Sequence, residues 1–249
     1  MFEVLFQHGP FTFRTFNLFL ALAFLFTTIF LLRYILRKKM SATFLSNHFL
    51  FLLLLGFLLG RVFYIIENWS FFENSWIKML MIWDLKISSF GFFYGTLLGL
   101  FLFTRMAKEH FWVWLDALVL SGMVGLIGLH VGHFFNGSDF GIPSTLPWAI
   151  SFDSPSIPFA NPLHPTQLYS ALITFLIFGY AMKYNRRVHL SGMVGNRVIV
   201  LYSLSAFSLD FLHGAPSAYA KISFLIIAAT AFIFFVHCSH QTHSSHEPS

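Results

Sequence analysis

The sequence predicts an all-α integral membrane protein with about seven transmembrane helices. Of its 249 residues, 57% are hydrophobic and only 10% are charged, too apolar a balance for a globule that faces water on all sides. The apolar residues form segments of roughly 20, the length at which a helix crosses a bilayer. Lys and Arg gather in the short connections between these segments, a pattern typical of the inner side of a membrane.

The seven expected spans follow one another along most of the chain. They cover residues 16–36, 47–66, 87–104, 111–135, 166–182, 198–212 and 219–236. Between the second and third spans, the tryptophans of Trp76–Trp83 bracket an apolar stripe, which favours a segment lying flat at the membrane interface. We expect one membrane domain over residues 1–237 and a disordered, His-rich tail over residues 238–249.

The Lys and Arg residues indicate the orientation of the chain. Ten of the fifteen lie at or beside the connections that follow spans one, three and five. Because basic residues are enriched on the cytoplasmic side, we expect the N-terminus outside and the C-terminus inside. The membrane thus explains the net charge of +5, and we expect no nucleic-acid partner.

The connection between spans four and five, residues 136–165, is long and rich in proline. It holds six of the nine prolines, so it cannot cross the bilayer as a helix. His130 and His133 precede it, and His164 lies at its end. In the expected orientation this outer loop gathers polar groups at the membrane surface, where they are costly and often functional.

Two spans each carry a pair of polar residues three positions apart. His130 and His133 share one face of span four, and Asp210 and His213 share one face of span six. The pattern leaves three interpretations open: hydrogen bonds between helices, a zinc or iron site, or a site for a lipid or other substrate. The single cysteine, Cys238, lies beyond the last span, so no cysteine-based metal motif is expected.

Six segments carry a resemblance to a known family. They are HGPFTFRTFNL at 8–18, LLGRVFYII at 58–66, FYGTLLG at 93–99, LDALVLSGMVGLIGLHVGHFFNGSDFG at 115–141, LHPTQLYSA at 163–171 and LYSLSAFSLDFLHG at 201–214. In this order they resemble the prolipoprotein diacylglyceryl transferases, seven-span enzymes of the bacterial inner membrane. The resemblance implies transfer of diacylglyceryl from a phospholipid donor, phosphatidylglycerol, to the lipobox cysteine of a lipoprotein precursor peptide.

The resemblance also implies site residues. Those expected to bind the substrates are Arg61, Asn136, Gly137, His164, Gln167, Tyr169 and His213. Those expected to be catalytic are His130, His133, Tyr94 and Asp210. A thiol has a pKa of about 8.5, so a neutral imidazole at His130 or His133 is a suitable base for the lipobox cysteine. No cofactor is expected.

The departures from the family bear on phosphate binding. His130, Ala206 and His213 stand where the family has arginines. Arginine offers phosphate a permanently charged fork, whereas histidine loses its charge near neutral pH. Arg61 is then the cation we expect to hold the donor. Two alternatives stay open: a non-catalytic relative that binds lipid or lipoprotein precursors, and a lipid-modifying enzyme with a His/Asp metal site.

Overall fold

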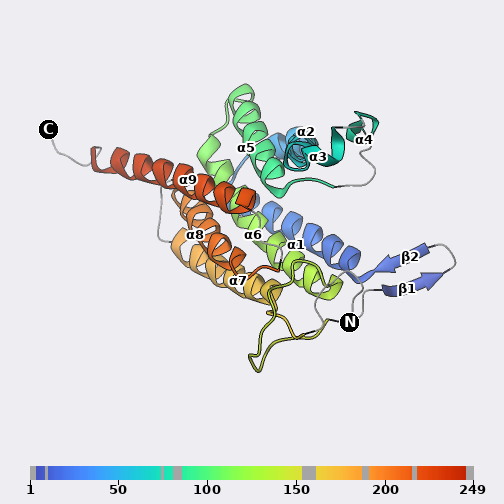
Figure 1. The fold of residues 1–249 in the computed structure, drawn as a ribbon. Helices are drawn as coiled ribbons and strands as arrows, with labels where there is room; N and C mark the ends of the chain where they lie inside the picture. Colours follow the sequence, from blue (N-terminus) through green and yellow to red (C-terminus); the bar gives the residue numbers. More distant parts are fainter. Residues whose placement is uncertain are drawn as a thin grey trace. The chain divides into compact units, whose positions relative to one another are not determined.

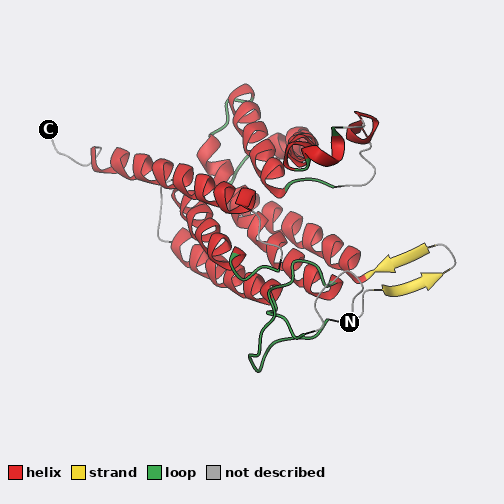
Figure 2. Ribbon diagram, viewed as in Figure 1, coloured by secondary structure: helices red, strands yellow, loops and turns green. Residues whose placement is uncertain are grey.

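The computed structural model of the protein is mainly helical (Figure 1). It describes residues 4–8, 11–73, 76–80, 86–152, 161–186, 191–214 and 218–244. The helices are α1 (Thr15–Lys38), α2 (Ala42–Glu67), α3 (Trp69–Phe72), α4 (Trp76–Leu80), α5 (Ser89–Met106), α6 (Phe111–Asn136), α7 (Thr166–Asn185), α8 (Met193–Asp210) and α9 (Ala218–Ser244). Two strands, β1 (Val4–His8) and β2 (Phe11–Arg14), precede them (Figure 2).

Each of the seven expected spans coincides with a long helix. Within the described residues, α1, α2, α5, α6 and α9 are long and apolar enough to cross a membrane. Helices α7 and α8 cover the fifth and sixth expected spans but do not belong to these five. These helices fit the expected integral membrane protein.

The two ends of the chain differ from the expected pattern. At the N-terminal end, β1 and β2 pair antiparallel, with Phe6 opposite Phe13 and His8 opposite Phe11. At the C-terminal end, α9 continues to Ser244, so residues 238–244 of the expected disordered tail are helical. Residues 245–249 of that tail lie outside the described residues, as do residues 81–83 of the expected interfacial segment, of which α4 is the described part.

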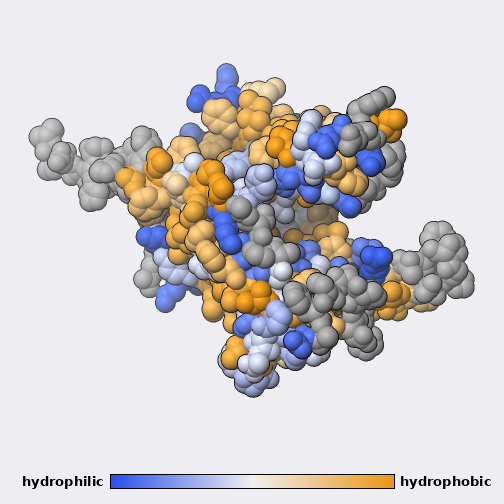
Figure 3. Space-filling view, viewed as in Figure 1, coloured by the Kyte–Doolittle hydropathy of each residue, from blue (hydrophilic) through white to orange (hydrophobic). Residues whose placement is uncertain are grey.

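The chain forms two compact units. Residues 1–34 and 116–249 make the first unit, and residues 35–115 make the second. In the first unit α8 lies between α7 and α9, and α1 packs on α6 where Gly128 faces Ala23 (Figure 1). Apolar side chains cover the visible face of α9, as expected for a helix that meets lipid (Figure 3).

The second unit is built on a close pair of helices, α2 and α5. Glycines line the contact between them, and a Cβ added at Gly91 would lie 2.5 Å from the carbonyl oxygen of Leu59. A Cβ at Gly95 would lie 2.6 Å from the carbonyl oxygen of Leu55. The backbones therefore touch directly, as in small-xxx-small packing between membrane helices.

A buried carboxylate connects two helices of the first unit. Asp116 of α6 is only 6% exposed, and its two oxygens accept hydrogen bonds from the backbone N–H groups of Gly192, at 2.8 Å, and Gly195, at 2.6 Å. These N–H groups belong to the N-terminal end of α8, where a negative charge is favourable. Asp116 thus fixes where α8 begins relative to α6.

Candidate functional site

The site begins where α6 ends, in the first unit. The backbone N–H of Ser138 donates to the carbonyl of His133 at 3.1 Å, and that of Gly137 donates to the carbonyl of Phe134 at 3.2 Å. Gly137 has φ 69°, so these two bonds form a Schellman end. Asp139 follows with φ 56°, a conformation that aspartate tolerates better than most residues. Gly137 and Asp139, two left-handed residues separated by Ser138, change the direction of the chain just after the helix.

The segment that follows is held between the start of α7 and the end of α8. On one side, the N–H of Gly141 donates to the carbonyl of His164 at 3.0 Å. On the other, Ile142 donates to Leu212 at 2.9 Å, and Gly214 donates to Phe140 at 2.8 Å. Figure 2 shows this part of the first unit as loop. These backbone bonds bring three motifs, far apart in sequence, to one place.

The side chains gathered there include two histidines on either side of one carboxylate. The Nδ1 atom of His133 shares a hydrogen bond with the Ser138 hydroxyl at 2.7 Å and lies 3.6 Å from Asp139 Oδ2. The Nε2 atom of His213 lies 3.9 Å from Asp139 Oδ1. The side chain of Asn136 also donates to the Ser138 hydroxyl, at 3.3 Å. We call His133, Asn136, Ser138, Asp139 and His213 the outer-loop cluster.

Gln167 attaches the start of α7 to this cluster. It is 1% exposed, and its Nε2 donates to the Ser138 carbonyl at 2.6 Å. Thr166 beside it donates its hydroxyl to the Asp139 carbonyl at 2.6 Å. Gln167 Oε1 and His213 Nδ1 are buried and have no hydrogen-bond partner within the described part of the chain. Buried polar atoms are normally paired, so these two mark a place where a ligand or water is expected to bind.

The remaining expected residues of the first unit lie around the cluster. His130 Nε2 lies 3.4 Å from the hydroxyl of Tyr202 on α8, so this imidazole faces the helix that carries Asp210. His164 Nδ1 lies 3.3 Å from the hydroxyl of Tyr169, which also accepts from Trp148 Nε1 at 2.8 Å. His164 and Tyr169 thus hold the outer loop to α7.

Asp210 has a cationic neighbour that the sequence analysis did not anticipate. Lys221 of α9 places its Nζ 3.6 Å from Asp210 Oδ2 and 4.5 Å from the centre of the Phe211 ring. The carboxylate is 11% exposed and the lysine 26% exposed. Three residues after Asp210, His213 belongs to the outer-loop cluster, so Lys221 brings a positive charge to the same end of α8.

Arg61 and Tyr94 belong to the second unit. Arg61 is 8% exposed, and its guanidinium donates to the carbonyls of Lys86 and Lys78, each at 3.0 Å, and to that of Met79 at 3.5 Å. These bonds hold the chain around α4 to α2. Tyr94 lies with its ring 5.6 Å from that of Phe93. Arg61 therefore stabilises the fold of the second unit, a role that its sequence context did not predict.

A metal site receives no geometric support from the residues that the structure describes. Among them, no group of three or more His, Cys, Asp and Glu side chains is placed to hold a metal ion. The carboxylate of Asp139 is instead shared between two imidazoles at distances of ion pairing.

Four residues that contribute to the site, Ser138, Asp139, Tyr202 and Lys221, are not among the expected site residues. The sequence signal for Ser138 and Asp139 is their position directly after Gly137, a glycine at a helix end. The sequence signal for Lys221 is a lysine in the first turn of an apolar helix, where a charged side chain often has a functional role. Tyr202 lies within an apolar span and had no signal of its own.

The fold and cluster define a polytopic membrane protein with a polar site where the loop after α6 meets α7 and α8. A profile of the family described as prolipoprotein diacylglyceryl transferase matches residues 3–238. The chain belongs to this family.

Individual relatives agree with this assignment. The phosphatidylglycerol–prolipoprotein diacylglyceryl transferase of Synechococcus sp. is 32% identical over 178 residues, covering 70% of this chain and 64% of the relative. That of Prochlorococcus marinus is 29% identical over 237 residues, covering 85% of this chain and 78% of the relative. That of Chloroherpeton thalassium is 28% identical over 182 residues, covering 72% and 66%. The chain thus matches somewhat less than two thirds of the Synechococcus protein.

Proposed function

We propose that this protein is a diacylglyceryl transferase that moves diacylglyceryl from an anionic phospholipid to the cysteine thiol of a lipoprotein precursor. The observation that carries the proposal is the outer-loop cluster, in which His133, Ser138 and Asp139 share short contacts. The family membership and the names of the relatives supply the reaction and both substrates, phosphatidylglycerol and prolipoprotein.

His133 is the base for the thiol in this proposal. When Nδ1 carries the ring proton and directs it toward Ser138 and Asp139, the lone pair is on Nε2, which accepts the thiol proton. Asp139 stabilises the imidazolium that forms, as a carboxylate does beside a catalytic histidine. His130, which contacts Tyr202, acts as a positioning residue.

The other half of the reaction is departure of the phosphate. The thiolate attacks the glycerol carbon that bears the phosphate, the C–S bond forms, and the C–O bond to phosphate breaks. The leaving group gains negative charge and needs a cation. Lys221 is that cation in our proposal, because it is charged, partly exposed and adjacent to the end of α8. Arg61 is a weaker candidate, since its donors are directed at backbone carbonyls.

The test is transfer from phosphatidylglycerol to a synthetic lipobox peptide by purified protein in detergent, read by mass spectrometry. General-base catalysis contributes about 100-fold or more, so His133→Ala should lower the rate by at least that factor. His48→Gln is the matched control, because His48 lies in the second unit and contacts the carbonyl of Phe44. Absence of product with every phospholipid tried would refute the transferase, and retained peptide binding would then favour the non-catalytic alternative.

The same assay examines Lys221. Lys221→Met should lower kcat/KM for the donor about tenfold, the effect of losing one charged hydrogen bond, and Lys221→Arg should restore most of it. Because Lys221→Met leaves Asp210 without its cation, the double variant with Asp210→Asn separates phosphate binding from folding. Full activity of this double variant would exclude Lys221 from the reaction.

We also propose that the chain forms one membrane domain through residue 237. It crosses the bacterial inner membrane seven times, with the N-terminus outside. The bias of Lys and Arg supports this orientation. A membrane-impermeant maleimide should label Cys238 only after cells are permeabilised. In a Cys238→Ser background, Ser144→Cys in the outer loop should react in intact cells. The reverse labelling would overturn the orientation.

A further inference from the structure

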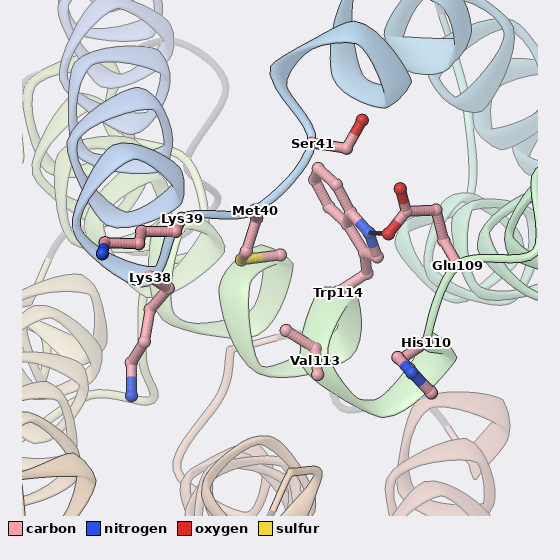
Figure 4. A pocket seen from close by; sticks show the side chains of 8 residues that line it. All are labelled: Lys38, Lys39, Met40, Ser41, Glu109, His110, Val113 and Trp114. Carbon is pink, nitrogen blue, oxygen red and sulfur yellow. Dashed lines mark hydrogen bonds between the residues drawn. The ribbon is translucent and has the colours of Figure 1, made fainter.

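A cavity lies at one end of the second unit, away from every residue of the outer-loop cluster in sequence. Its volume is about 440 Å³, and its lining comes from the end of α1, the α1–α2 connection, the α5–α6 connection and the first turn of α6. Figure 4 shows the lining side chains. Nothing in the proposed transfer reaction uses them.

The lining combines an apolar centre with a basic edge. Met40 and Val113 lie in the middle of the view, with Lys38 and Lys39 to one side of them and Glu109 and His110 to the other (Figure 4). Trp114 lies between Met40 and Glu109 and donates its Nε1 to Glu109 Oε2 at 3.2 Å (Figure 4). An apolar floor beneath cations is the arrangement that accepts the glycerol region and phosphate of a lipid.

The charge around the cavity is strongly one-sided. The connections that form it carry Arg37, Lys38, Lys39, Arg105 and Lys108 against the single acid Glu109. That acid already accepts the indole N–H of Trp114. The Ser41 hydroxyl accepts from the N–H of Phe44 and caps α2, so the positive end of that helix also faces this region. The partner that complements this charge is an anion.

The position of the cavity along the helices indicates whether the bound anion is a soluble molecule or a lipid. The cavity lies where the membrane-length helices α1 and α2 meet, and where α5 gives way to α6. The cations and the tryptophan are thus at headgroup depth, next to exposed apolar side chains such as Leu36 and Met106. A phospholipid satisfies both the basic edge and the apolar floor, whereas a free phosphate satisfies only the first.

We propose that this cavity binds the headgroup of an anionic phospholipid from the leaflet at this end of the helices. Lys38 and Lys39 contact the phosphate, and Met40 and Val113, which lie between these lysines and His110, contact the glycerol region and the first acyl carbons. This site is separate from the donor site of the proposed transferase and does not depend on it. The bound lipid holds the α1–α2 and α5–α6 connections together.

The experiment measures lipid-dependent stabilisation of the full chain in neutral detergent. Phosphatidylserine is the probe, because the relatives' names give phosphatidylglycerol as the donor, and phosphatidylcholine is the neutral comparison. Phosphatidylserine should raise the Tm and remain bound in native mass spectra. A basic residue near an anionic surface is worth a factor of roughly five in affinity, so Lys38→Gln/Lys39→Gln should weaken binding roughly 25-fold.

Two controls make the result decisive. Lys183→Gln/Arg186→Gln removes the same charge from the end of α7, outside the cavity, and should leave phosphatidylserine binding unchanged. Equal weakening by both double variants would mean a general charge effect and overturn the site. His133→Ala should also leave binding unchanged, and its loss there would place the lipid in the outer-loop cluster.

A soluble headgroup separates the two sources of phosphate. Glycerol phosphate has the phosphate but no acyl chain, and it should neither stabilise the protein nor displace phosphatidylserine at equal concentration. If it stabilises as strongly as the lipid, and this effect is lost in Lys38→Gln/Lys39→Gln, the cavity binds a soluble phosphate and the lipid assignment is wrong.

Discussion

Arg61 and the outer-loop cluster are both polar groups in an apolar chain, but they use their hydrogen bonds differently. Arg61 directs its guanidinium at backbone carbonyls of Lys78, Met79 and Lys86. The outer-loop cluster joins side chain to side chain, and among the residues that the structure describes its buried His213 Nδ1 has no hydrogen-bond partner. Hydrogen bonds from a side chain to backbone carbonyls stabilise the fold. Hydrogen bonds among side chains that leave some polar atoms unpaired keep those atoms available to a ligand.

The largest effect that tests this comparison is loss of stability at Arg61. Arg61→Ala removes charged hydrogen bonds worth about 1.5–3 kcal/mol each and leaves the carbonyls of Lys78 and Lys86 unpaired, so the free energy of unfolding should fall by at least about 3 kcal/mol. Unfolding in detergent, followed by circular dichroism, measures it. An unchanged Tm together with lost transfer activity would make Arg61 a substrate residue and break the comparison.

Asp116 provides a second backbone-paired group, this time in the first unit. Asp116→Asn replaces one accepting oxygen with a donor that faces the N–H of Gly192 or Gly195. The loss of this helix-terminal contact should cost about 1–2 kcal/mol of unfolding free energy. At a temperature where both proteins are folded, transfer activity should stay within a factor of two. A tenfold loss of activity without loss of Tm would contradict a purely structural role.

The smallest effect on stability is expected at Asp139, inside the cluster. Its side chain is 51% exposed, and asparagine tolerates the φ of 56°, so Asp139→Asn should change the free energy of unfolding by less than about 0.5 kcal/mol. Because the carboxylate stabilises the His133 imidazolium in our proposal, transfer should slow about tenfold or more. Wild-type activity in Asp139→Asn would remove the carboxylate from the mechanism.

The sequence predicts the helices of this protein better than it predicts the site. Apolar segments located the seven long helices of the described residues, five of which are long and apolar enough to cross a membrane, and the break at Asn136-Gly137 marks the end of α6. Such signals are local, because they depend on residues that are neighbours along one helix. The sequence does not predict the β1–β2 hairpin, because its strands are short and follow no long apolar segment.

The residues of the site are far apart in sequence. The spacing of residues along one helix therefore does not predict which side chains meet there. His130 and His133 share a helix face, yet one contacts Tyr202 and the other Ser138 and Asp139. Which partner each histidine meets depends on how the loop after α6 pairs with His164 and Leu212 through its backbone. Lys221 likewise lies next to Asp210 only because α9 packs beside α8.

The glycine contact between α2 and α5 has a consequence for how this sequence can change over time. The atoms that meet at Gly91 and Gly95 are backbone atoms, which every residue possesses. Side chains on the opposite faces of the two helices, such as Leu54 and Leu98, are exposed and contribute little to holding the pair together. Those outer positions are therefore free to drift with the lipid composition of the host, while the glycines tolerate almost no replacement.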